Sequence, residues 1–193
     1  MQPGIQPELA TERLVLRPRN QGDLVRIAAM NSDPEVMRFI APTDDPFMQV
    51  EGLAKRSFTY VAQGLGYWSV SRRGQDDDLI GYVGLIADGP ALGRVELSYR
   101  FEMRHWGRGY AVEAASRLLA HAFEALGLAE IVIFTHPLNT ASLKLAGRLG
   151  FVREADRPSA MMGLPDFPCA FLRLSQVRWR NDQTGIAIGR KAR

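Results

Sequence analysis

Hydrophobic residues along the chain change repeatedly between a period of two and a period of about 3.6. In ERLVLRPR, Leu14 and Leu16 occupy alternate positions between the charged residues Arg13 and Arg17, as in a half-buried strand that Pro18 ends. The spacing of Leu24 and Ile27 is instead typical of one face of a helix. These periods predict strands at residues 12–19, 67–73, 79–87, 94–103, 131–136, 151–154 and 167–174, and helices at residues 23–30, 33–40, 47–63, 109–126 and 139–149.

The order of these elements predicts a mixed α/β domain. Three consecutive strands separated by the turn-rich stretches GQDDD and DGPALG indicate an antiparallel meander. Asp33 is expected to cap the helix that starts at Pro34. Because the chain shows no repeat and no linker, we expect one domain over residues 1–175, followed by a loosely held basic tail at residues 176–193 that lacks an apolar period.

Composition narrows the possible functions only moderately. The 193 residues are 46% hydrophobic, which suffices for one buried core. A net charge of +3 does not by itself require nucleic acid and suits anionic small molecules equally well. The single cysteine, Cys169, excludes an intramolecular disulfide, and His105, His121 and His136 lack metal-ligand spacing, so no metal is expected. The N-terminal stretch lacks a signal pattern and no apolar run suits a membrane span, so we expect a soluble cytoplasmic protein.

The stretch RHWGRGYAVEAA places Gly107 and Gly109 between a strand and a helix. Unpaired N–H groups at a helix start bind anions, and glycine permits positive φ and close approach of a ligand. A plain strand-to-helix turn would give the same pattern. The loop lacks the Lys-Ser/Thr pair of a Walker motif, and Glu113 and Ala114 break a GxGxxG motif. The remaining interpretation is a site for a ligand that carries a diphosphate and is bound without magnesium.

Arg104-x-x-Gly107-x-Gly109 after LSYRF resembles the Q/R-x-x-G-x-G/A acetyl-CoA pyrophosphate loop of the GNAT superfamily of N-acetyltransferases. WGRGYAVEA is similar in particular to the branch of ribosomal-protein N-terminal (RimJ/RimL-type) acetyltransferases. TERLVLRP, DPEVMRFI, GYWSV with LIGYVGL, FEALGL, and Asn139-x-x-Ser142 before Gly150-Phe151 follow in that branch's order, so the resemblance covers about residues 11–173. It implies a mostly antiparallel seven-stranded sheet with helices on both faces, acetyl-CoA as cofactor, and a possible homodimer.

The resemblance also assigns cofactor contacts. In this family the strand before the loop splays from its neighbour, and pantetheine pairs with freed backbone groups as an added strand would. The residues assigned in this way are Tyr99, Phe101 and Met103 for the pantetheine, Arg104, Trp106, Gly107, Arg108, Gly109, Tyr110 and Ala111 for the pyrophosphate, and Asn139 and Ser142 on the later helix. For Asn139, a helix cap is the alternative role.

An amine must lose its proton before it attacks a thioester, and an α-amino group with a pKa of about 8 needs modest help. Glu96 is the candidate base, acting directly or through water; the alternative is a surface carboxylate paired with an arginine. Val95, Leu97 and Tyr99 alternate with it, so Glu96 faces away from the apolar face. Many relatives protonate the leaving thiolate from a tyrosine, which NTASLKLAGRLGF lacks; the resemblance offers Ser142 as acid or thiolate donor.

Aromatic residues from three segments could form the acceptor pocket. We expect Trp68, Tyr82 and Phe39 to bind the acceptor, with ordinary core packing as the alternative for each. A covalent route through Cys169 is conceivable, although no neighbouring residue in the sequence supplies a base.

The sequence favours an acetyl-CoA-dependent N-acetyltransferase that acts on a primary amine by direct attack in a ternary complex. A protein N-terminal α-amine is one acceptor, and a small amine such as a polyamine, amino acid or antibiotic is another. A peptide cleft would suit the acids Asp44, Asp45 and Glu51. A non-catalytic CoA-binding module and a nucleic-acid module built on the tail are further alternatives, although the tail carries no aromatic ladder beyond Trp179.

Overall fold

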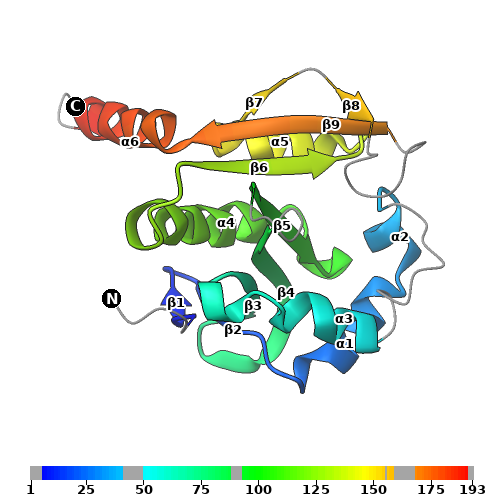
Figure 1. Ribbon diagram of the computed structural model, residues 1–193. Coiled ribbons are helices and arrows are strands. Elements are labelled where there is room, and N and C mark those ends of the chain that lie inside the picture. The colour runs from blue at the N-terminus through cyan, green and yellow to red at the C-terminus, as the bar shows by residue number, and fades with distance from the viewer. Residues whose placement is uncertain (1–5, 41–49, 88–92, 155, 159–167, 191–193) are drawn as a thin grey trace.

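The computed structural model describes residues 6–40, 50–87, 93–154, 156–158 and 168–190 (Figure 1). Its strands are β1 (Leu9–Ala10), β2 (Leu14–Pro18), β3 (Gly66–Arg72), β4 (Gln75–Ala87), β5 (Val95–Phe101), β6 (Glu130–Thr135), β7 (Val152–Arg153), β8 (Arg157–Pro158) and β9 (Pro168–Ser175). Its α-helices are α1 (Asp23–Asn31), α2 (Pro34–Met37), α3 (Val50–Phe58), α4 (Tyr110–Ala120), α5 (Thr140–Arg148) and α6 (Gln176–Arg190). Short 3₁₀ turns lie at Val61–Gln63 (η2) and Met103–His105 (η3), and α4 ends in a π-helical turn at His121–Ala125 (η4).

The strands form a mixed sheet in the order β1-β2-β3-β4-β5-β6-β9-β7, with β8 paired to β9 beside this path. Every neighbouring pair is antiparallel except β5 and β6, which run parallel. The predicted α/β class and the predicted meander are therefore confirmed. The described residues contain nine strands rather than seven, because β1 and β8 are two residues long and carry no alternating pattern that would reveal them.

Helices cover both faces of the sheet, as expected. Residues paired across strands share a face, so Trp68, Val83 and Tyr99 point to one side, whereas Tyr67 and Tyr82 point to the other. The first side packs against α4 and α5 in the main core. The second side packs against α1 and α3, which lie together at the lower right of Figure 1.

Most predicted element bounds hold within a few residues. The Asp33 carboxylate accepts a hydrogen bond from the Glu35 N–H at 2.9 Å, which confirms the cap of α2. The third predicted helix is divided into α3 and η2, and residues 47–49 at its start lie outside the described residues. The prediction that all of GQDDD forms a turn is wrong, because β4 already begins at Gln75. Within this stretch only Gly74, with a φ of 75°, belongs to the turn.

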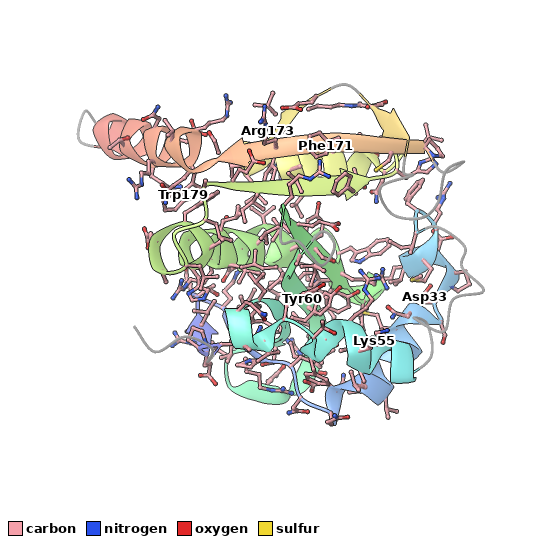
Figure 2. The ribbon with its side chains drawn as sticks, viewed as in Figure 1. Asp33, Lys55, Tyr60, Phe171, Arg173 and Trp179 are labelled. Atoms are coloured by element: carbon pink, nitrogen blue, oxygen red, sulfur yellow. The ribbon has the colours of Figure 1, made fainter. Side chains whose placement is uncertain are left out.

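The expected loose tail is helical over most of its length. Helix α6 follows β9 directly and extends away from the sheet (Figure 1). Trp179 is only 9% exposed, and its ring centroid lies 5.3 Å from that of Phe123, next to α4 in Figure 2. Gln176 donates to the Phe123 carbonyl at 2.7 Å, and Arg178 donates to the Gly150 carbonyl at 2.8 Å. One aromatic anchor and two hydrogen bonds therefore hold the start of a helix that has no regular apolar stripe.

In the described part of the chain, no helix is both long enough and apolar enough to cross a membrane.

Candidate active site

Strands β5 and β6 separate soon after they meet. β5 pairs with β4 along its whole length, but with β6 it shares only the pair Glu96–Val132. The Glu102 N–H donates to the Ile80 carbonyl at 3.1 Å, on the β4 side. Since backbone groups alternate in direction along a strand, those of Tyr99 point toward β6, into the space that the divergence opens. The splayed strand pair is confirmed.

The indole of Trp106 occupies a backbone group of β5 that the cofactor was expected to contact. Its indole Nε1 donates to the Phe101 carbonyl at 2.7 Å, although the residue remains 48% exposed. The N–H of Phe101 is therefore the group that can pair with a ligand. The sequence suggested that the strand continues to Met103. Instead, β5 ends at Phe101, and Met103 begins the 3₁₀ turn η3.

The glycine loop has the geometry that the sequence predicted. Gly107 has a φ of 72° and Gly109 a φ of 81°, in the left-handed region that disfavours other residues. A Cβ built on Gly107 would meet no atom within 4 Å, so open space lies in front of it. Gly109 caps α4 without a side-chain hydrogen bond, which leaves the first N–H groups of the helix directed out of the turn. Tyr110 and Ala111 begin this helix, so the loop fits a pyrophosphate.

The two arginines that were expected to bind the pyrophosphate, Arg104 and Arg108, differ in their partners. Arg104 Nε lies 2.6 Å from a Glu102 carboxylate oxygen, so its charge is balanced within the protein. Glu102 and its hydrogen bond also raise the pKa of Arg104. The side chain of Arg108 is exposed, and its backbone carbonyl accepts a hydrogen bond from Arg13 at 3.1 Å. Arg108 is therefore the arginine of the pair that is better placed to meet an anion.

Arg13 is a residue that sequence reasoning missed. Its guanidinium lies 2.6 Å from the Glu113 carboxylate and 4.8 Å from the ring centroid of Tyr110. Burial raises the pKa of Glu113, but hydrogen bonds from Thr11 and Arg13 outweigh this effect and hold the pKa below its ordinary value. The N-terminal strand thus supports the first turn of α4. No local signal could have shown this, because the partners are 100 positions apart.

A hydroxyl pair lies on the α5 side of the gap. The Tyr99 hydroxyl and Ser142 Oγ share a hydrogen bond of 2.8 Å. The Asn139 carboxamide accepts from the Ser142 N–H at 3.0 Å, so its capping role is confirmed. Burial raises the pKa of Tyr99 to about 12. The Tyr99 side chain thus reaches α5, whereas the sequence suggested only backbone contacts for Tyr99.

Glu96 lies on the opposite face of β5, away from the main core, as its alternation predicted. It is half-buried and shares this face with Tyr67 and Tyr82. Arg56 hydrogen-bonds to Tyr67, and electrostatic interactions with Tyr67 and then with Glu96 raise the pKa of Arg56. Burial raises the pKa of Tyr67. A carboxylate and a guanidinium therefore lie together among tyrosines on this face of the sheet.

The structure separates the three expected pocket residues. Tyr82 is on the Glu96 face, whereas Trp68 is fully buried on the α4 side, where its indole donates to the Pro7 carbonyl at 2.8 Å. Tyr67 and Trp68 point in opposite directions because they are neighbours in a strand. Phe39 stacks near His136 beyond the end of β6, with ring centroids 5.5 Å apart.

Cys169 is buried close to the same face. Burial raises the pKa of its thiol to about 11, and the Glu96 carboxylate contributes in the same direction. At neutral pH this thiol carries almost no thiolate, so it is a poor nucleophile. The aromatic residues Phe134 and Phe171 continue this face onto β6 and β9, where Figure 2 shows Phe171, with ring centroids 5.2 Å apart.

A cavity of about 370 Å³ lies between α1, α2 and the residues that follow β5. Met30, Val36 and Met103 contribute apolar surface, and Asp33 and Glu102 contribute acids. Neither Glu96 nor Ser142 lines it, so this cavity is separate from the candidate catalytic groups. Among the described residues, no group of three or more metal-ligating side chains is assembled.

A splayed strand pair, a glycine-rich anion loop and polar groups on both sides of the gap define an acyltransferase that uses a CoA thioester. Residues 13–152 match the family model described as an acetyltransferase (GNAT) domain. The chain belongs to the GNAT family of acetyltransferases, and its homologues indicate an N-acetyltransferase.

Three similar proteins illustrate the relationship. An uncharacterized N-acetyltransferase from Bacillus licheniformis, p20, is 32% identical over 151 residues, covering 76% of this chain and 83% of the relative. A crystal structure of an acetyltransferase from Agrobacterium tumefaciens has a TM-score of 0.73 at 29% identity, covering 87% and 94% of the two chains. RimL, a ribosomal alpha-N-protein acetyltransferase in complex with coenzyme A, has a TM-score of 0.71 at 12% identity, with 88% and 98% covered. This last likeness shows the fold.

Proposed function

We propose that the protein transfers an acetyl group from acetyl-CoA to a primary amine by direct attack within a ternary complex. The observation that carries this proposal is the position of Glu96 at the last residue pair between β5 and β6. The gap opens beside this carboxylate, and the strand on which it lies leads into the glycine loop. Acetyl-CoA supplies the activated thioester, and the residues below hold it and manage the protons.

The loop binds the pyrophosphate through backbone N–H groups of residues 107–111. Positive φ at Gly107 and Gly109 turns these groups outward, and Arg108 adds an exposed positive charge. The Tyr99 backbone and the Phe101 N–H pair with the pantetheine in the manner of an added strand. A backbone N–H of β5 at the point of separation polarises the thioester carbonyl.

Glu96 accepts a proton from the acceptor amine, directly or through water. An ammonium group has no lone pair, so removing its proton is a condition for attack. Arg56, near Glu96 and hydrogen-bonded to Tyr67, holds the carboxylate in place and keeps this face polar. The alternative of a plain surface carboxylate fits less well, because Glu96 is half-buried on the face that carries Tyr67 and Tyr82.

Tyr99 and Ser142 stabilise the departing sulfur. A thiol has an ordinary pKa of about 8.5, whereas burial raises the pKa of Tyr99 to about 12. Full proton transfer from this phenol would run uphill by roughly 5 kcal/mol, at 1.36 kcal/mol per pKa unit. The hydroxyl pair therefore acts by donating a hydrogen bond to the thiolate. Ser142 is thus a hydrogen-bond donor to the thiolate rather than a general acid.

The acceptor is a primary amine that reaches the Glu96 face. A protein N-terminal α-amine, as in the name of RimL, and a small amine both fit this description. The buried thiol of Cys169 suits a reducing compartment, and we place the protein in the cytoplasm.

Calorimetric titration of acetyl-CoA into the native protein and into Gly107→Glu tests the proposal. The variant adds a negative charge where the pyrophosphate should lie, so micromolar binding should disappear. Gly74→Glu is a matched control, because Gly74 has a φ of 75° and equally open space, in a distant turn. Absence of binding to the native protein, or equal loss in both variants, would exclude the assignment of the loop.

A further inference from the structure

A buried arginine on the Glu96 face is only partly hydrogen-bonded. Arg19 is only 6% exposed, and its Nη1 donates to Ser57 at 2.9 Å. No described residue provides a hydrogen-bond partner for its Nε and Nη2. A guanidinium with unsatisfied donors away from water is costly unless an anion compensates it.

The aromatic surroundings of Arg19 do not supply that anion. Its guanidinium lies 4.1 Å from the ring centroid of Tyr67 and 4.4 Å from that of Tyr82. Asp23 is the acid whose charge acts on Arg19, but this carboxylate already accepts two hydrogen bonds from Arg17, at 2.8 and 2.6 Å, and one from Ser69 at 2.7 Å. Asp23 is thus committed elsewhere, and Arg19 keeps its excess charge.

A second arginine lies on the same face. Arg100 on β5 is half-buried, lies 5.7 Å from the Tyr82 ring centroid, and donates to the buried Asn31 at 2.5 Å. In the described part of the chain, the Asn31 Nδ2 also has no hydrogen-bond partner. The positive charge of Arg100 contributes to lowering the pKa of Arg19, so the two guanidinium groups repel each other. Around Tyr82, the side chains of Arg19, Asn31 and Arg100 present hydrogen-bond donors, and no carboxylate of the described residues is hydrogen-bonded to them.

We propose that Arg19, Asn31 and Arg100 bind a carboxylate of the acceptor, so that the enzyme acetylates amines that also carry a carboxylate. Arg100, the more exposed member, contacts the carboxylate, and Arg19 strengthens the site from within. This inference rests on the proposed acetyl transfer at Glu96.

The strand geometry sets the distance between the two ends of such an acceptor. Glu96 and Arg100 are four residues apart on one face, so their Cα atoms are about 13 Å apart at about 3.3 Å per residue. Their side chains span part of this distance, so the amine and the carboxylate are separated by several bonds. A polyamine brings only positive charges to this face, which already holds Arg19, Arg56 and Arg100 against Glu96, and is disfavoured by repulsion.

Product binding tests the proposal without depending on turnover. The protein saturated with CoA is titrated calorimetrically with N-acetyl derivatives of glycine, 4-aminobutyrate and 6-aminohexanoate, and with the corresponding amides. Because acid and amide differ only at the carboxylate, the ratio of their Kd values reports the anion site. We expect at least one acid to bind about tenfold more tightly than its amide, with a longer member preferred over glycine.

Arg100→Gln should remove most of this ratio, whereas Arg148→Gln, the same charge change on an exposed position of α5, should retain it. Equal binding of every acid and its amide to the native protein overturns the inference without the need for a variant, as does a ratio that survives in Arg100→Gln. In either case, intact CoA binding leaves the proposed function standing. Failure to bind CoA at all would overturn the proposed function itself.

Discussion

The hydroxyl groups of Tyr99 and Ser142 lie 2.8 Å apart although the residues are 43 positions apart in the chain. This hydrogen bond joins β5 to α5 across the gap that opens between β5 and β6. Asn139 fixes the same serine from the other side by accepting from its backbone N–H. The pair is therefore held at the start of α5, where the sulfur of a CoA thioester is expected to leave.

Tyr99→Phe and Ser142→Ala should each lower kcat by about tenfold with little change in KM, because each removes a hydrogen bond that strengthens only as the thiolate forms. The double variant should lose little more than either single variant, since the two hydroxyls act as one unit. Steady-state kinetics with acetyl-CoA measures this. Tyr60→Phe, on a partly buried tyrosine packed against the core, is the control. Independent, multiplying losses would show that the hydroxyls do not act together.

Glu96→Gln should lower kcat at pH 7 by about a hundredfold, within the range typical of a general base. The variant should regain activity by about tenfold per pH unit below the pKa of the acceptor amine, because free amine then forms without the base. A pH–rate profile measures this difference. Glu124→Gln, on an exposed carboxylate after α4, should behave as the native protein. A parallel profile in the variant and the native enzyme would remove Glu96 from the base role.

The alternation in RVELSYRF was sufficient to place Glu96 on the face away from the main core, because a strand has only two sides. The same logic could not assign Trp68. Helices cover both faces of this sheet, so YWSV has an aromatic residue on each face, and only the pairing with β4 shows which one faces Glu96.

The glycine loop was the most predictable part of the site. Positive φ is a local property of Gly107 and Gly109, and the resemblance to a known loop specified its use. Arg13 and Arg19 were not predictable, since their roles depend on partners brought together by the sheet. Helix α6 escaped prediction for a related reason. Trp179 is the one buried apolar residue in the described part of this helix, and one apolar residue forms no period.

Trp179→Ala should lower the free energy of unfolding by about 3 kcal/mol, since it empties a buried site against Phe123. Val177→Ala, on a residue of the same helix that is 69% exposed, should change it by less than about 0.5 kcal/mol. Urea unfolding followed by fluorescence or circular dichroism measures both. Equal, small effects would mean that the start of α6 is not packed in solution.

Asp23 should make stability sensitive to acid. Burial raises the pKa of this carboxyl, but hydrogen bonds from Arg17, the Asn20 backbone and Ser69 outweigh burial, so the folded pKa lies below the ordinary value. A lowered folded pKa contributes stability above the unfolded pKa of about 3.9, and this contribution is lost as pH falls through the folded pKa.

Asp23→Asn should therefore cost about 3 kcal/mol at pH 7, because Arg17 loses a buried partner, and should cost less below pH 4. Urea unfolding between pH 3 and 7 measures the difference between variant and native protein. Asp156→Asn, which breaks the exposed pair with Arg153, should cost less than about 1 kcal/mol at every pH. A pH-independent cost for Asp23→Asn would contradict the assigned charge state.

Cys169→Ser should leave kcat within about twofold of the native value, because direct attack needs no acyl-cysteine. Burial raises the pKa of the thiol to about 11, so at pH 7 only about one molecule in ten thousand carries the thiolate. Alkylation by iodoacetamide should accordingly be slow at pH 7 and accelerate by about tenfold per pH unit up to that pKa. Mass spectrometry after brief incubation with acetyl-CoA provides the complementary test. Accumulation of an acetylated enzyme that Cys169→Ser abolishes, together with loss of turnover in that variant, would replace direct attack by a two-step route through this cysteine.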